Sequence, residues 1–210
     1  MNHEATRRNY NRLSRWYDLI SSSERRFTEA GLHMLNVRPG EQVLEIGFGT
    51  GHSLVWLAQA VGQKGRVLGI DLSEGMLQTA RKRVEEAGVN ERVELSFGDA
   101  TRLPQTVNSL DAIFMSFTLE LFDTADIHLV LAECSRVLRS GGRLGVVSMA
   151  KKNIFAVRLY ELAHAHFPNL LDCRPIHAQE ILRSAGFEIG EATMKSVWGL
   201  PVEIILARKA

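Results

Sequence analysis

Short apolar segments alternate with amphipathic segments along most of this chain. From about residue 41, runs rich in Val, Leu and Ile alternate with stretches whose apolar residues recur at helical spacing. Strands that alternate with helices are joined by right-handed crossovers, so this order predicts a parallel sheet covered on both faces. The predicted strands lie at 42–46, 66–71, 92–96, 110–116 and 143–149, and the predicted helices lie at 52–62, 73–87 and 124–139.

The last part of the chain ends in two consecutive strand-like runs, which predict an antiparallel pair. The elements expected there are an amphipathic segment at 154–166, a helix opened by Pro175 and ended near Gly186, and strands at 187–194 and 202–208. We therefore expect an α/β fold with a doubly wound, mostly parallel seven-stranded sheet, an antiparallel last strand and helices on both faces.

Two helical patterns precede the first predicted strand. Residues 7–20 place apolar side chains on one face and arginines on another, and the pattern at 25–35 ends at Pro39–Gly40. Because both lie ahead of the alternating units, we expect an N-terminal helical lid at 1–40. Residues 41–210 would then form the sheet domain as a single structural unit.

A glycine-rich turn follows the first predicted strand. Gly47, Gly49 and Gly51 are spaced two residues apart, and a helical pattern starts directly at His52. A strand that enters such a turn and leaves as a helix exposes backbone N–H groups at the helix N-terminus, where a ligand can bind. In an open parallel sheet, ligands bind at the carboxyl ends of the strands. The turn therefore predicts a cofactor site.

Two carboxylates are expected at the same edge of the sheet. Asp71 ends the second strand and can accept hydrogen bonds from both hydroxyls of a ribose. Asp99 follows the third strand within reach of an adenine amine, and Leu72 and Met76 can lie on either side of the adenine ring. The structural alternative is that Asp71 caps the helix that begins at Ser73 and that Asp99 caps a turn.

Glu45 discriminates between two kinds of nucleotide cofactor. The dinucleotide pattern G-x-G-x-x-G would require glycine at position 52, where this chain has His52. The carboxylate of Glu45, two residues ahead of Gly47, would repel a pyrophosphate and attract a cationic ammonium or sulfonium. The pattern therefore favours a positively charged nucleoside.

Composition excludes several classes of protein. A chain of 210 residues with 45% hydrophobic content can bury a core, and its formal net charge of +1 indicates no nucleic-acid partner. Cys134 and Cys173 are far apart and lack metal-ligand spacing, so we expect free thiols in a reducing cytoplasm and no metal site. We find no signal peptide and no apolar run long enough to span a bilayer, which predicts a soluble, cytoplasmic protein.

Four motifs occur in the order found in one large family. They are Val43–Gly51, Gly69–Leu77, Gly98–Ala100 and Leu138–Leu144. In these motifs the chain resembles the class I S-adenosylmethionine-dependent methyltransferases, whose fold is Rossmann-like. The stretch Tyr10–Asp18 is similar to the N-terminal signature of ubiquinone/menaquinone-biosynthesis methyltransferases and of phosphatidylethanolamine N-methyltransferases. The segment between Met149 and Pro175 is shorter than the substrate-binding insertion of typical quinone methyltransferases.

The resemblance implies S-adenosylmethionine as cofactor, S-adenosylhomocysteine as product, and a small-molecule or lipid-like acceptor. It also implies a role for each matching residue. For the methionine part, Gly47, Gly49 and Gly51 would let it approach the backbone, Glu45 would brace the loop, and Tyr10 and Tyr17 would close over the carboxylate end. For the nucleoside, Asp71 would hold the ribose, Leu72 and Met76 would flank the adenine, and Asp99 with the Ala100 amide would bind the edge of the adenine. Ser116 and Phe117 would lie beneath the sulfonium.

A catalytic base is optional for such a reaction, because an amine acceptor need only arrive uncharged. The side chains expected near the rim are Tyr17, Asp18, Glu120 and His164, and the sequence singles out none of them as catalytic. His164 and His166 are two residues apart on a predicted helix, so they point in different directions and do not form a metal pair.

Three questions stay open from the sequence. The arginines near the N-terminus, beside Trp16 and Phe27, permit contact with an anionic membrane surface, or they form a solvated helix face. The same crevice would suit an NAD-dependent oxidoreductase or a nucleoside-binding protein without catalysis. The oligomeric state and the acceptor atom are not indicated.

Overall fold

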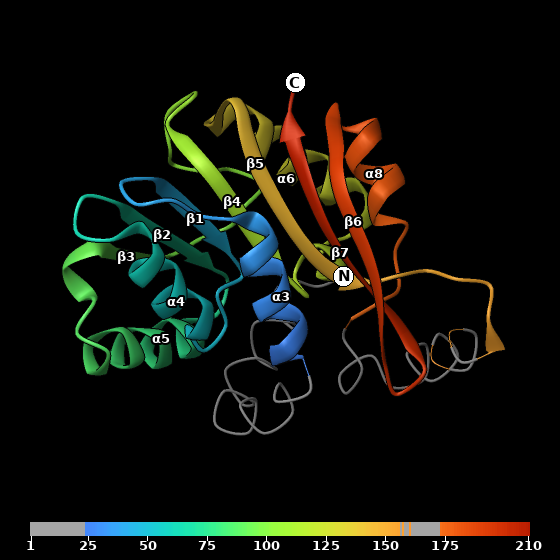
Figure 1. Cartoon of the computed structure of the whole chain (residues 1–210), viewed down its shortest axis with the longest axis horizontal. Helices are drawn as coiled ribbons and strands as arrows, with labels where there is room; N and C mark the ends of the chain where they lie inside the picture. Colours follow the sequence, from blue (N-terminus) through green and yellow to red (C-terminus); the bar gives the residue numbers. More distant parts are fainter. Residues whose placement is uncertain (1–23, 156, 158–159, 161–172) are drawn as a thin grey trace.

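The computed structural model describes residues 24–155, 157, 160 and 173–210. Its seven strands form one sheet in the order β3-β2-β1-β4-β5-β7-β6, with helices on both faces (Figure 1). Strand β7 is antiparallel to β5 and β6, whereas β1 to β5 pair in parallel. The predicted fold class is confirmed.

The bounds of the elements follow the predicted pattern closely. The strands are β1 (Gln42–Ile46), β2 (Arg66–Asp71), β3 (Val93–Phe97), β4 (Leu110–Ser116), β5 (Leu138–Met149), β6 (Phe187–Val197) and β7 (Leu200–Lys209). The α-helices are α3 (Arg25–Leu35), α4 (His52–Val61), α5 (Glu74–Glu86), α6 (Thr124–Val137) and α8 (Ala178–Ser184), and short 3₁₀ turns lie at η2 (Asn90–Arg92) and η3 (Leu119–Leu121). The helical segment at 7–20 and most of the segment at 154–166 lie outside the described residues.

Strand β5 begins five residues earlier than predicted. Leu138 pairs with Leu110, and the next paired residues are Ala112 and Arg143, so β5 contains extra residues at this point. Gly141, with φ +70°, lies in this irregularity. Gly141 and Gly142, which lie just after the helix predicted at 124–139, are therefore part of the strand, and α6 ends at Val137.

The helices divide between the two faces of the sheet. Helices α3, α4 and α5 pack on one face of the sheet, and α6 and α8 pack on the other (Figure 1). Each face of the sheet has one apolar core beneath its helices. Strand β1 is buried on both sides because Val43 belongs to one core and Leu44 to the other. Among the described helices, none is long and apolar enough to cross a membrane.

Helix α3 lies directly against the sheet. Phe27, Leu32 and Leu35 are buried, and Gly31 permits a close approach, since a Cβ there would lie 2.5 Å from Cγ2 of Val147 in β5. Helix α3 therefore contributes to the core as well as preceding the first strand. The rest of the predicted lid, residues 1–23, lies outside the described residues.

Candidate functional site

A pocket lies at the carboxyl ends of β1 and β4, where the strand order of the sheet reverses. The glycine turn forms one wall, the residues after β4 form another, and the first turns of α3 cover it. The pocket is lined by Glu24, Arg25, Thr28, Glu45, Gly47, Phe48, Gly49, Thr50, His52, Ser53, Ser116 and Phe117. Five residues predicted for the cofactor site are among them, namely Glu45, Gly47, Gly49, Ser116 and Phe117.

The three glycines of the turn all have positive φ, at +70°, +51° and +86°. A Cβ on Gly47 would lie 2.4 Å from Cγ2 of Thr118, and one on Gly51 would lie 2.9 Å from Cβ of Ala80. A Cβ on Gly49 would meet nothing within 4 Å. Gly47 and Gly51 are therefore required for internal packing, whereas Gly49 faces open space in the pocket wall.

Asp71 connects the end of β2 to this turn. Its Oδ2 accepts the N–H of Gly49 at 3.0 Å, and its Oδ1 accepts the N–H of Ser73 at 2.9 Å. Helix α5 is capped by Ser73, whose Oγ accepts the N–H of Met76 at 3.2 Å. Burial raises the pKa of Asp71 from its ordinary 3.8 to about 6, against the opposing effect of these backbone N–H groups. Asp71 therefore braces the glycine turn and is not the helix cap.

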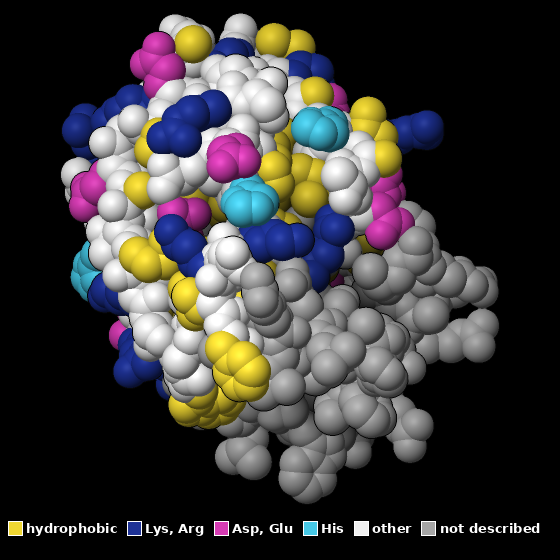
Figure 2. Space-filling view, turned by 90° about the vertical axis from the view of Figure 1, so that its right-hand side faces the viewer, with side chains coloured by type: hydrophobic (Ala, Val, Ile, Leu, Met, Phe, Trp, Pro, Cys, Tyr) yellow, Lys and Arg dark blue, Asp and Glu magenta, His cyan; other side chains and the backbone are white. Residues whose placement is uncertain are grey.

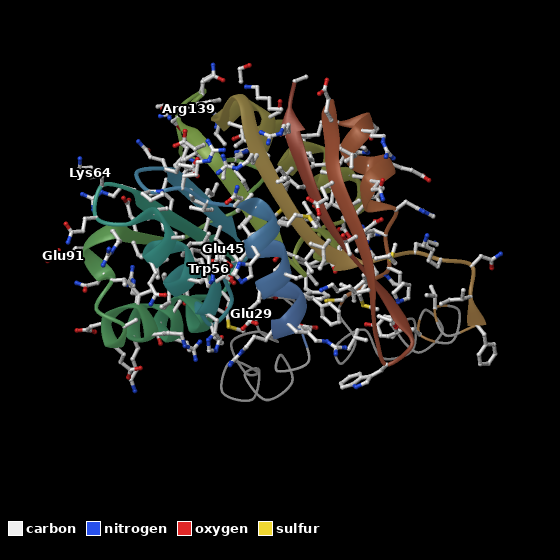
Figure 3. All side chains as sticks on the ribbon, in the orientation of Figure 1. Glu29, Glu45, Trp56, Lys64, Glu91 and Arg139 are labelled. Carbon is white, nitrogen blue, oxygen red and sulfur yellow. The ribbon has the colours of Figure 1, made fainter. Side chains whose placement is uncertain are left out.

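Glu45 supplies a buried carboxylate to the pocket. Its side chain is 2% exposed, and Figure 3 shows it between α3 and α4. Burial raises its pKa well above the usual range, with a further contribution from the charge of Asp71, while a hydrogen bond with Ser53 acts in the opposite direction. Within the described part of the chain, Oε2 of Glu45 has no hydrogen-bond partner. Such an atom is rare in folded proteins, and here it offers an acceptor to a donor group bound in the pocket.

Helix α3 contributes residues that the sequence did not identify. Oγ1 of Thr28 lies 2.8 Å from Oγ of Ser116, and Nη2 of Arg25 lies 3.2 Å from Nε2 of His52. Thr28 precedes the buried Leu32 and Leu35 by four and seven residues in the sequence. That helical spacing placed Thr28 beside the apolar stripe and could have indicated that it faces the sheet.

The residues predicted for the adenine do not line this pocket. Met76 and Ala100 are buried in the core, while Leu72 and Asp99 keep part of their surface exposed. Oδ1 of Asp99 accepts the N–H of Thr101 at 2.9 Å, the turn-capping contact that was the structural alternative. Contacts of these four residues with a cofactor stay predictions.

Glu120 lies in the core instead of at the rim where a base was expected. It is 0% exposed, and its Oε1 accepts the N–H of Met149 at 3.0 Å, which holds the end of β5. A role as base would require this side chain to reach the pocket. Tyr10, Tyr17, Asp18 and His164 lie outside the described residues. The described residues contain no cluster of three His, Cys, Asp or Glu side chains that could hold a metal ion.

Comparison with known proteins places these features in context. Residues 43–142 match the family described as "Methyltransferase domain". A demethylmenaquinone methyltransferase of Listeria welshimeri is 36% identical over 123 residues, which is 59% of this chain and 51% of the relative. The chain thus spans about half the length of the curated relatives it matches.

Solved structures share the fold over most of the chain. A SAM-dependent methyltransferase from Aquifex aeolicus is 25% identical, with a TM-score of 0.66 over 87% of this chain and 89% of that one. Geranyl diphosphate C-methyltransferase from Streptomyces coelicolor, solved with Mg²⁺, geranyl diphosphate and S-adenosyl-L-homocysteine, is 16% identical, with a TM-score of 0.73 over 89% and 81%. At that identity the second likeness concerns the fold alone.

Proposed function

We propose that this chain, which carries a methyltransferase domain and resembles the class I S-adenosylmethionine-dependent methyltransferases, transfers the methyl group of S-adenosylmethionine to a small-molecule or lipid-like acceptor. The observation that carries this proposal is that the buried side chain of Glu45 lines the same pocket as the glycine turn. Burial favours the protonated form of Glu45 in the cofactor-free protein; a bound cation would stabilise its carboxylate form, whereas a pyrophosphate would oppose it. S-adenosylmethionine carries two cationic groups, an ammonium and a sulfonium.

The residues of the pocket fit this cofactor. Glu45 would accept a hydrogen bond from the ammonium group, and the open space beside Gly49 would admit the methionine backbone. Asp71 accepts the backbone N–H groups of Gly49 and Ser73, with a further contact from the N–H of Leu72, and its carboxylate keeps acceptor capacity for a ribose hydroxyl. Ser116 and Phe117 would lie near the sulfonium.

The chemical work required of the protein is alignment. The cofactor supplies a methyl group that is already activated by positive sulfur. Holding the methyl donor and the acceptor in the right geometry can lower the activation free energy by roughly 7–11 kcal/mol. Glu45 and Asp71 would hold the donor, and Arg25 and Thr28 from the start of α3 line the pocket beside it. An amine acceptor that arrives neutral needs no base, whereas a phenol or a carbon acid needs a proton acceptor.

Two of the comparisons support a lipid-like acceptor. The Listeria relative is named a demethylmenaquinone methyltransferase, and the Streptomyces structure contains geranyl diphosphate, so lipid-like and isoprenoid acceptors occur among similar proteins. We propose a phospholipid amine or a quinone-type acceptor for this chain. The predicted basic helix at 7–20 would bring the protein to the membrane from a cytoplasmic location.

Two other functions use the same pocket. An NAD-dependent oxidoreductase would place a pyrophosphate beside the Glu45 carboxylate, which is unfavourable. A nucleoside-binding protein without catalysis would bind S-adenosylhomocysteine and transfer nothing.

Methyl transfer is tested directly with S-adenosylmethionine labelled in the methyl group. The protein is incubated with a total lipid extract, and in parallel with a demethylated quinone and with phosphatidylethanolamine. We expect label in the organic phase of at least one reaction, and an Asp71→Ala variant serves as the matched negative control. Binding of S-adenosylhomocysteine with no label in any acceptor would favour the non-catalytic alternative.

A further inference from the structure

The tip of the β6–β7 hairpin carries a tryptophan in a strained and exposed position. Trp198 is 85% exposed and has φ +49°, and Gly199 follows with φ +82°. Because Val197 pairs with Leu200, these two residues form a two-residue turn in which both have positive φ. Such a turn favours Asn, Asp or Gly in its first position and disfavours a bulky side chain. Trp198 therefore stabilises neither the turn nor the core.

A second exposed aromatic residue lies at the same end of the molecule. Phe155 is 81% exposed, and it follows the exposed Ile154 in the segment after β5. This segment leaves the sheet beside the hairpin, since the N–H of Ala150 donates to the carbonyl of Pro201 at 2.9 Å. Figure 1 shows the hairpin tip and the segment at the end where β5 terminates.

Basic residues accompany these aromatic side chains. Lys151, Lys152 and Lys195 are exposed, and Nη2 of Arg26 donates to the carbonyl of Ser196 at 3.1 Å. Figure 2 shows hydrophobic side chains projecting at the lower edge of the described surface, with Lys and Arg nearby. We call this region the tip surface; its residues are Arg26, Lys151, Lys152, Ile154, Phe155, Met194, Lys195 and Trp198. Acidic side chains also lie near it, namely Glu24 and Glu29 at the start of α3 and Glu203, which pairs with Met194 across the hairpin.

We propose that the tip surface docks on a membrane that contains anionic lipids. Tryptophan favours the interface between headgroups and acyl chains, and lysines beside it are attracted to a negative surface. The charge also argues against a second copy of this chain as occupant, because two tip surfaces would bring like charges together. A membrane therefore fits both the aromatic and the basic side chains.

Docking at this surface would bring the pocket close to the lipid. Arg25 and Thr28 line the pocket, and Arg26 between them bonds to the hairpin. The tip surface and the pocket thus share the first turns of α3. A lipid-like acceptor would reach the pocket from the membrane, and in this respect alone the inference rests on the proposed function.

The test is co-sedimentation of the 210-residue chain with phosphatidylcholine vesicles, with and without phosphatidylglycerol. We expect binding to the anionic vesicles that weakens as salt is added, and a loss of about tenfold in partitioning for Trp198→Asn. Asparagine suits the turn better than tryptophan, so this variant should melt no lower than wild type. The matched control is Leu129→Asn, which removes an exposed apolar side chain from α6 and should bind as wild type.

A second readout is the fluorescence of Trp198 in a Trp16→Phe, Trp56→Phe background. Brominated lipids in anionic vesicles should quench it. The proposal is overturned if anionic vesicles bind no protein, or if Trp198→Asn binds them as well as wild type, which would place the contact elsewhere in the chain. It is also overturned if, without vesicles, the wild-type protein is a dimer by analytical ultracentrifugation and Trp198→Asn is a monomer. Binding of S-adenosylhomocysteine, measured in parallel, reports separately on the pocket.

Discussion

The carboxylate of Asp71 accepts the backbone N–H of Gly49 at 3.0 Å, so the end of β2 is bonded to the middle glycine of the turn after β1. One side chain thereby fixes the turn, and in the proposed complex its remaining acceptor capacity would serve a ribose hydroxyl. Removal of the carboxylate should therefore affect the cofactor in two ways, by loss of ribose contacts and by loosening of the turn.

Asp71→Ala should weaken binding of S-adenosylhomocysteine by about 2 kcal/mol or more, the range expected for hydrogen bonds to a charged group. Isothermal titration calorimetry measures this. The control is Asp111→Ala, which removes a carboxylate that bonds to Gln42 and Arg139 outside the pocket. Equal affinities of wild type and Asp71→Ala would remove the ribose assignment.

The raised pKa of Asp71 predicts an unusual pH dependence for the stability of the cofactor-free protein. Because the pKa of Asp71 rises from 3.8 to about 6 on folding, the folded state holds this proton where the unfolded state has lost it. Stability therefore falls as pH rises through this window. Asp71→Asn imitates the protonated form at every pH.

The difference in unfolding free energy between wild type and Asp71→Asn should consequently shift by about 2 kcal/mol between pH 4.5 and 7.5, with wild type losing stability relative to the variant. Urea denaturation at each pH measures it. A difference independent of pH would show that Asp71 ionises normally.

Glu45→Gln should separate stability from binding. The neutral amide is easier to bury than the carboxylate, so the cofactor-free variant should be at least as stable as wild type. The loss of charge should weaken binding of S-adenosylhomocysteine by about 2 kcal/mol. Thermal melts with and without ligand report both quantities. A variant that is less stable but binds normally would indicate that Glu45 serves the fold alone.

The glycines of the turn should respond differently to alanine. Gly47→Ala forces a Cβ against Thr118 and should destabilise the protein by about 2 kcal/mol or more, since overpacking adds to an unfavourable φ. Gly49→Ala meets no protein atom, so it should cost about 1 kcal/mol of stability and act mainly on ligand affinity. Chemical denaturation and ligand titration on both variants test this contrast. Equal loss of stability would contradict it.

Local patterns predicted most of the fold. The glycine turn, the carboxylates at strand ends and the alternation of strands with helices all depend on residues close in the sequence. The start of β5 did not follow from such a pattern, because it depends on pairing of Leu138 with Leu110 across the sheet. With that pair formed, α6 ends at Val137, ahead of the end of the helix predicted at 124–139.

The site shows the same division between local and long-range information. Glu45, Gly47 and Gly49 were identified because they belong to one contiguous motif, and the structure places them in the pocket. The contact of Thr28 with Ser116 spans 88 residues and required the packing of α3 on the sheet. The strain at Trp198 is a property of the backbone that only coordinates reveal.

Calorimetric titration of the protein with S-adenosylhomocysteine and with NAD tests the central claim most directly. The account predicts binding of S-adenosylhomocysteine at one site per chain, abolished or weakened by Asp71→Ala and by Glu45→Gln, and no measurable binding of NAD under the same conditions. Binding of NAD in preference to S-adenosylhomocysteine, or of neither ligand, would contradict it.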